Sequence, residues 1–282
     1  MSDHDVVVLS EIHCANVKHA PGFIPVVAKN DSPTHRGGLV VLFKYHIYPE
    51  FYGIDKSVPE QVWFKLRCLP QVQFCGAYVA PSDSPYSCDS SLAEIQAKTT
   101  CNGLHYIIVG DLNARCGSTV QDLTSALPNS SYRPVDLSIN NNGRDVKQLC
   151  IDNSLLILNN LVFDNKFYEG GMTFRRKKKW ISELDLCILS PALLGYTERL
   201  HVSNDTKNPS DHAPVSVEFK FTSDLVSPHS ILAKAETTDG HAVLMSDAYN
   251  QPLCRKPIPL QHAHTLRHVA ICLFHFQRFV CC

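Results

Sequence analysis

The sequence predicts an α/β protein in which buried β-strands end in polar side chains. Residues 5 to 10 and 105 to 110 are short apolar runs rich in valine and isoleucine, which is typical of strands buried on both faces. Residues 61 to 68 and 72 to 79 predict the two strands of a hairpin, and the first of them alternates apolar and polar side chains. Residues 87 to 100 carry apolar side chains at helical spacing.

The other elements follow from the same patterns of apolar residues, turn residues and caps. Ser87 or Asp89 is available as the cap of the helix at 87 to 100. The remaining predicted elements are, in chain order, a strand at 37 to 48, a long polar loop at 118 to 142, a short helix opened by Gly143 and Arg144, a strand at 155 to 158, a hairpin at 170 to 189 whose return strand is 180 to 189, and a strand at 215 to 221.

The pattern of apolar residues that predicts strands stops after Phe221. Residues 222 to 282 contain proline-rich and histidine-rich pieces and then an apolar end. We therefore predict one domain over residues 1 to 221 and a C-terminal appendage of unknown order over residues 222 to 282. His264 and His268 lie four residues apart, but without two further ligands a solvated pair is favoured over a metal site.

Composition narrows the class of protein. The 282 residues carry a formal net charge of −1, so contact with a polyanion must come from a local patch. The twelve cysteines include no C-x-x-C pair, and most lie in apolar runs, which favours reduced thiols in an intracellular protein. No signal peptide is visible, and no apolar segment is long enough to cross a bilayer.

Four predicted strand ends carry acidic, amide or imidazole side chains. Burying such groups is costly unless they are paired or used, although a capped turn or a solvated strand end would also explain each one alone. Gathered at one edge of a sheet, the carboxylates would require a cation, and oxygen ligands suit Mg²⁺ or Mn²⁺ better than zinc. The chemistry that this set predicts is metal-assisted hydrolysis of a phosphoester. Its members are Glu11, Asp111, Asn113, Asp185, Asp211 and His212.

These residues lie within a series of motifs. In order, they are Glu11 after its strand, GAYVAPSDSPY at 76 to 86, GDLNAR at 110 to 115, TF followed by ISELDLCIL, and SDHAPV at 210 to 215. The series resembles the endonuclease/exonuclease/phosphatase superfamily, and most of all the endonuclease domains of non-LTR retrotransposons. The resemblance covers residues 5 to about 220. It implies a deoxyribonuclease I-like, four-layer α/β sandwich and Mg²⁺-dependent cleavage of nucleic-acid phosphodiesters.

The resemblance also implies roles for individual residues. Glu11 would be the metal ligand and Tyr78 a hydroxyl on the phosphate side. Asp111 and Asn113 would handle the attacking water. Asp185 would support the site, and Asp211 with His212 would form a carboxylate–imidazole pair.

Two features depart from the family pattern. Family members begin with an additional strand that supplies an asparagine to the active site, whereas only ten residues precede Glu11 here and none of them is asparagine. We therefore expect a truncated copy that lacks its first strand and has an open sheet edge beside Val6 to Leu9. In addition, residues 222 to 282 show no pattern expected of a reverse transcriptase.

The predicted turn of the 170 to 189 hairpin is strongly basic. A run of this kind is often only a solvated surface or a nuclear-import signal, but beside Asp185 it could bind the backbone of a nucleic acid, with DNA favoured. Two other functions stay open: hydrolysis of a phosphorylated lipid or small phosphoester on the same fold, and an inactive relic with residual nucleic-acid binding. The basic residues are Arg175, Arg176, Lys177, Lys178 and Lys179.

Overall fold

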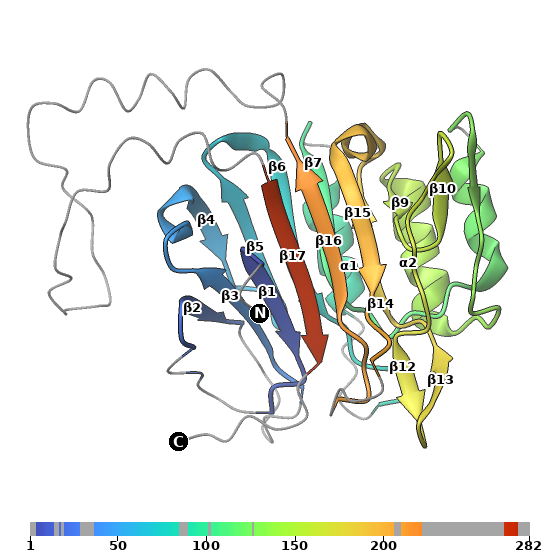
Figure 1. Ribbon diagram of the computed structural model, residues 1–282, viewed down its shortest axis with the longest axis horizontal. Coiled ribbons are helices and arrows are strands. Elements are labelled where there is room, and N and C mark those ends of the chain that lie inside the picture. Colours follow the sequence, from blue (N-terminus) through green and yellow to red (C-terminus); the bar gives the residue numbers. More distant parts are fainter. Residues whose placement is uncertain are drawn as a thin grey trace, which may run out of the picture.

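Two mixed β-sheets lie face to face, and helices α1 and α2 lie on the outer side of the second sheet (Figure 1). The predicted α/β sandwich is therefore confirmed. None of the helices in the described part of the chain is long and apolar enough to span a membrane. This computed structural model describes residues 4–13, 17, 20–28, 37–84, 90–100, 103–125, 127–205, 210–221 and 268–275.

In the described part of the chain, each of the two large sheets has six strands. In spatial order, the first contains β15 (Thr197–Val202), β16 (Val215–Lys220), β17 (His268–His275), β1 (Val6–Ser10), β3 (Leu39–Lys44) and β2 (Phe23–Val27). The second contains β4 (Phe51–Asp55), β5 (Gln61–Leu66), β6 (Leu69–Tyr78), β7 (His105–Asp111), β14 (Asp185–Leu189) and β9 (Leu156–Ile157).

Shorter elements surround the two sheets. The helices are α1 (Ser90–Thr99), α2 (Asn141–Asp152) and the 3₁₀-helices η1 (Tyr48–Glu50), η2 (Gly117–Thr124) and η3 (Pro191–Tyr196). A small sheet contains β11 (Lys166–Phe167), β10 (Leu161–Phe163) and β8 (Ser130–Tyr132), and a hairpin contains β12 (Phe174–Arg176) and β13 (Lys179–Ser182).

Strand β1 is buried on both faces, as its continuous apolar sequence predicts. Val6 and Val8 lie in the core between the sheets, whereas Val7 and Leu9 lie in a second cluster on the opposite face. The alternation follows from the period of two along a strand. The predicted hairpin of β5 and β6 is also confirmed, since these strands pair antiparallel.

Strand β17 lies between β1 and β16, where the sequence predicts an open edge. It pairs parallel with β1, from Val6 opposite Ile271 to Ser10 opposite His275. It also pairs antiparallel with β16 and buries Val269, Ile271 and Cys272. The expected open edge beside β1 is therefore wrong for the described chain, because an apolar segment far along the sequence pairs with both flanking strands.

This strand also changes the predicted domain division. Residues 268–275, assigned to the appendage, belong to the first sheet (Figure 1). For residues 222–267, which lie outside the described residues, the separate appendage stays a prediction. The predicted helix caps Ser87 and Asp89 and the histidine at 264 lie outside the described residues as well.

Two local predictions are corrected by the structure. The segment 118 to 142 is not one loop, because it contains most of η2, all of β8 and the first two residues of α2. The segment 180 to 189 is not one strand either. It breaks after Ser182, and Asp185 then starts β14 in the second sheet, because this part of the chain pairs with β7 instead of β12.

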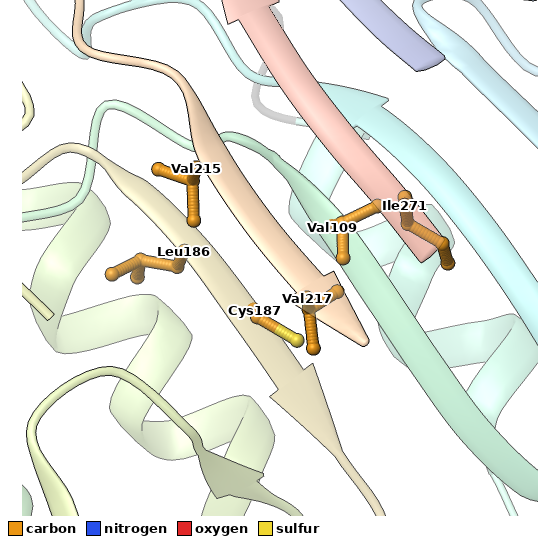
Figure 2. Close-up of a pocket in the computed structure, with 6 residues that line it drawn as sticks. All are labelled: Val109, Leu186, Cys187, Val215, Val217 and Ile271. Atoms are coloured by element: carbon orange, nitrogen blue, oxygen red, sulfur yellow. The ribbon is translucent and has the colours of Figure 1, made fainter. Parts of the chain in front are cut away.

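A small apolar void lies between the sheets (Figure 2). Its lining comes from both sheets, which shows that β16 and β17 lie directly over β7 and β14. Like the other cysteines in the described chain, the one that lines the void is a free thiol. The lining residues are Val109, Leu186, Cys187, Val215, Val217 and Ile271.

Candidate active site

Three neighbouring strands of the second sheet place polar side chains side by side. Strand β6 runs parallel to β7, with Tyr78 opposite Asp111, and β7 runs antiparallel to β14, with Asp111 opposite Asp185. Both carboxylates are buried, with exposed fractions of 0% for Asp111 and 1% for Asp185. The ends of β6 and β7 and the start of β14 therefore lie side by side along one edge of the sheet, as the sequence predicts.

His212 completes this row from the other sheet. It lies three residues before β16, and its Nδ1 is 2.8 Å from Oδ2 of Asp185. Both side chains are buried. Sequence reasoning paired His212 with its neighbour Asp211, and the structure corrects this pairing. Consecutive residues in an extended segment point in different directions, so the partner comes from a distant strand.

The charges around His212 keep it protonated. Burial by itself lowers the pKa of the imidazole, because it disfavours the charged form. The charge and hydrogen bond of Asp185, together with the charges of Asp111 and Asp211, outweigh burial and raise the pKa to about 10. At neutral pH the His212 side chain is therefore a buried cation.

This raised pKa predicts how stability depends on pH. The pKa of His212 rises from 6.5 to about 10 on folding, so its contribution is fully present below pH 6.5 and is lost as the pH rises through about 10. In EDTA, we expect the free energy of unfolding of the wild type to fall over this interval relative to that of His212→Gln. Urea denaturation at several pH values measures both curves, and parallel curves would contradict the prediction.

Glu11 and Tyr78 connect the two sheets at the same edge. The Tyr78 hydroxyl donates a hydrogen bond of 2.8 Å to Oε1 of Glu11, and Nε2 of His13 lies 3.7 Å from Oε2. Burial, with the charges of Glu11 and Asp111, raises the pKa of Tyr78 well above its usual value. Tyr78 is therefore a neutral hydrogen-bond donor at physiological pH.

Asn113 lies in a left-handed backbone conformation just after Asp111. Its φ is 47°, a region in which asparagine is among the better tolerated residues. Its backbone N–H donates to Oδ1 of Asp111 at 3.0 Å, and its Nδ2 donates to the carbonyl of Val79 at 2.9 Å. The segment after β7 is thus a tight turn that brings both side chains to the sheet edge.

Thr173 organises the site, although sequence reasoning identified it only as part of the TF motif. Its Oγ1 accepts hydrogen bonds from the backbone N–H groups of Leu184 and Asp185 at 2.9 and 3.1 Å. Its carbonyl accepts a hydrogen bond from the N–H of Ala213 at 2.7 Å. Thr173 therefore joins the start of β14 to the turn that carries His212.

The basic hairpin is attached to the same turn. The backbone N–H of Arg175 donates to the carbonyl of Asp211 at 2.7 Å. The ring of Phe174 meets the ring of His212 edge-on, with centroids 5.1 Å apart. The exposed turn at Lys177 and Lys178 extends away from this contact, at the lower edge of the molecule in Figure 1.

In the described residues, Asp111, Asp185 and His212 place acidic and imidazole groups together, with their nitrogen and oxygen atoms within 4.8 Å of one another. A protonated imidazole has no lone pair for a metal, so the ligand atoms that this group offers are the oxygens of Asp111 and Asp185. Carboxylate oxygens suit a hard divalent ion. The two carboxylates therefore fit a divalent metal. Glu11, the ligand that the resemblance implies, lies beyond Tyr78 on the same edge and stays a predicted ligand.

A two-sheet α/β sandwich with buried carboxylates and a histidine at one edge has the fold and site of a hydrolase of the nuclease and phosphatase type. The chain belongs to the endonuclease/exonuclease/phosphatase family, whose model matches residues 1–212. This confirms the membership that the motifs indicate. A search among curated proteins finds no match.

Solved structures share the fold at low sequence identity. The endonuclease domain of TRAS1, a telomere-specific non-LTR retrotransposon, is 17% identical with a TM-score of 0.53, over 74% of this chain and 82% of that one. The 3′ phosphatase NExo from Neisseria, bound to a product DNA hairpin, is 18% identical with a TM-score of 0.52, over 77% and 89%. The AP endonuclease LMAP from Leishmania major is 15% identical with a TM-score of 0.55, over 75% and 77%.

Proposed function

We propose that this protein is a Mg²⁺-dependent endonuclease of retroelement origin that nicks DNA. The observation that carries the proposal is the buried Asp185–His212 pair beside Asp111, at the edge where Tyr78 bonds to Glu11. Such a site brings together a cation (His212), a carboxylate (Asp111) and a neutral hydroxyl donor (Tyr78). These are the groups that hydrolysis of a phosphodiester requires.

Each residue has a proposed task. Asp111 orients and deprotonates the attacking water, and Asn113 positions that water with its side chain. The protonated His212 donates a hydrogen bond to the phosphate and stabilises the charge that develops in the transition state. Asp185 keeps this imidazole protonated and oriented.

Two further tasks concern the metal and the phosphate. Glu11 would hold Mg²⁺, with Mn²⁺ as the alternative ion, and the Tyr78 hydroxyl would contact the phosphate. The bound metal would polarise a phosphoryl oxygen and offset the charge of the leaving group.

The conformation of the basic hairpin supports a nucleic-acid substrate. Lys177 and Lys178 both have positive φ, at 50° and 67°, in the two-residue turn between β12 and β13. Asparagine and glycine are preferred in such turns, and a left-handed residue with a side chain costs about 1–2 kcal/mol. Lysine is therefore a poor choice for the stability of this turn. A role in contacting phosphates would explain why two lysines occupy it. Arg175, Arg176 and Lys179 add to this charge.

The salt dependence of DNA binding tests this contact. Replacing Lys177, Lys178 and Lys179 by alanine should flatten the plot of log affinity against log salt by about 0.9 for each lysine that contacts a phosphate. Binding of a short DNA duplex in EDTA measures the slope without cleavage. Alanine at the exposed Lys56 and Lys220 is the matched control and should leave it unchanged. An unchanged slope in the triple variant would remove the hairpin from the interface.

Plasmid nicking tests the function itself. Supercoiled plasmid is incubated with the protein and Mg²⁺, with and without EDTA, and compared with Asp111→Ala and His212→Ala. We expect nicking by the wild type that EDTA and both substitutions abolish. Asp145→Ala and His46→Ala change the same residue types at exposed positions and should nick normally. Absence of nicking by the wild type at every Mg²⁺ concentration would overturn the proposal.

The same assay separates the other candidates. Hydrolysis of a phospholipid headgroup or of a small phosphoester, in place of plasmid nicking, would favour a phosphatase on the same fold. DNA binding with no hydrolysis of any of these substrates would indicate an inactive relic.

A further inference from the structure

We propose that Asn140 is a positioning residue for catalysis, which holds the segment that carries Asn113 in its active conformation. The inference rests on the proposed function, and it concerns a residue that the sequence places in an unpatterned loop. In the structure, Asn140 is the N-cap of α2 and lies against the turn that follows β7.

Asn140 contacts this turn through its side chain and its backbone. Its Oδ1 accepts a hydrogen bond from the backbone N–H of Arg115 at 2.9 Å, and its Nδ2 donates to the carbonyl of Asn113 at 2.7 Å. Its backbone N–H donates to the carbonyl of Arg115 at 3.1 Å. The same Oδ1 caps the helix by accepting from the N–H of Gly143 at 2.8 Å.

The helix and the turn also approach each other closely at Gly143. A Cβ atom at this position would lie 1.9 Å from the carbonyl oxygen of Arg115, so only glycine fits. The Arg115 side chain is fixed separately, by two hydrogen bonds of 2.8 and 2.9 Å to Asp136. The turn is therefore held against the first residues of α2 at several points.

The neighbouring Asn142 braces the other side of the turn. Its side chain is buried, and its Nδ2 donates to the carbonyls of Ala80 and Leu112 at 3.1 and 3.0 Å. These carbonyls follow the ends of β6 and β7. Asn140 and Asn142 thus bind the chain before and after the left-handed Asn113, whose carbonyl needs a partner in this buried turn.

Small displacements at this turn have large kinetic consequences. A catalytic group that moves by about 1 Å can lose about a hundredfold in rate, even when the change lies away from the reacting atoms. The hydrogen bond from Nδ2 of Asn140 to Asn113 is the contact that acts on the water-handling pair directly. Loss of this bond should affect the rate of the chemical step more than substrate binding.

Three substitutions separate this contact from the helix cap. Asn140→Asp keeps an oxygen that can cap Gly143 and, as a carboxylate, has no donor for Asn113. Asn140→Ser also keeps an oxygen for the cap, but its single short hydroxyl replaces the amide NH₂ that reaches the carbonyl of Asn113. Asn140→Ala loses both the cap and the donor. We expect kcat for plasmid nicking to fall about tenfold or more in all three, with KM changed by less than about twofold. The melting temperature should fall clearly only in Asn140→Ala.

The matched control is Asn141→Ala. This neighbouring asparagine is exposed and accepts a hydrogen bond from Arg144 at the surface, so kcat should be unchanged. Unchanged kcat in Asn140→Ser would overturn the proposal. A fall in kcat confined to Asn140→Asp would also overturn it, because the effect would then come from the added negative charge. A loss of kcat in strict proportion to the loss of folded protein would also overturn it.

Amide hydrogen exchange tests the clamp without relying on activity. The backbone N–H of Arg115 should exchange about tenfold faster or more in Asn140→Ala, while the amides of β7 keep their protection. If the wild type fails to nick DNA, the proposed function fails but this measurement still decides the structural clamp. Unchanged exchange at Arg115 would show that Asn140 does not hold the turn.

Discussion

Replacement of Asp185 by asparagine is expected to lower plasmid nicking by about 10²- to 10⁴-fold, the range for a positioned acid or base. The carboxylate lies 2.8 Å from Nδ1 of His212, and both groups are buried. Burial lowers the pKa of His212, and the charge of Asp185 normally outweighs this effect. In Asp185→Asn only the charges of Asp111 and Asp211 oppose burial, so the pKa of His212 should fall. The residual activity should therefore decline at a lower pH than that of the wild type. A pH profile of nicking measures this shift.

A double-mutant cycle separates this role from metal binding. If Asp185 acts through His212, the loss in Asp185→Asn combined with His212→Gln should be much smaller than the product of the single losses. A combined loss equal to the product of the two single losses would instead indicate that Asp185 acts independently of the histidine. Asp145→Asn, the same change at an exposed position of α2, controls for the substitution.

The second large effect is expected from strand β17. Ile271→Ala should lower the free energy of unfolding by about 2–5 kcal/mol, because the side chain is 2% exposed in the core between the sheets. Domains of this kind are stable by only about 5–15 kcal/mol, so the variant should be close to unfolding. Strand β1 leads to Glu11 and β16 follows His212, so nicking should fall along with stability. Urea denaturation and plasmid nicking measure the two losses.

A matched substitution makes this result specific. Ile151→Ala removes the same atoms from α2, where the side chain is 47% exposed, and should change stability by about 0.5 kcal/mol or less. Equal effects of the two variants would mean that residues 268–275 do not complete the sheet. Ile271→Pro removes a hydrogen-bond donor from a strand paired on both sides and should prevent cooperative folding.

Local patterns predicted most of the second sheet and much of the first. The continuous apolar sequence of β1 and the paired runs of β5 and β6 predicted strands that the structure confirms. The break between β13 and β14 had no local signal, because both halves of residues 180 to 189 have the residue content of strands. Which sheet each half joins depends on pairing with β12 or with β7.

The candidate site was predictable to a similar extent. Asp111 and Asp185 were identified because carboxylates at the ends of apolar strands are costly to bury without a use. Asn140 and Thr173 were missed, since asparagine and threonine are ordinary residues in turns and at caps. Their importance depends on the backbone groups that they meet, and these belong to segments far away in the chain.

The sequence by itself determined the family, most strands of the second sheet, about half of those of the first, and most of the polar residues of the candidate site. These follow from local composition and from the order of short motifs along the chain. Only the tertiary structure decided that His212 bonds to Asp185, and that residues 268–275 lie between β1 and β16. Both depend on the register between distant strands, which is set by how well their apolar faces pack and their backbone groups pair.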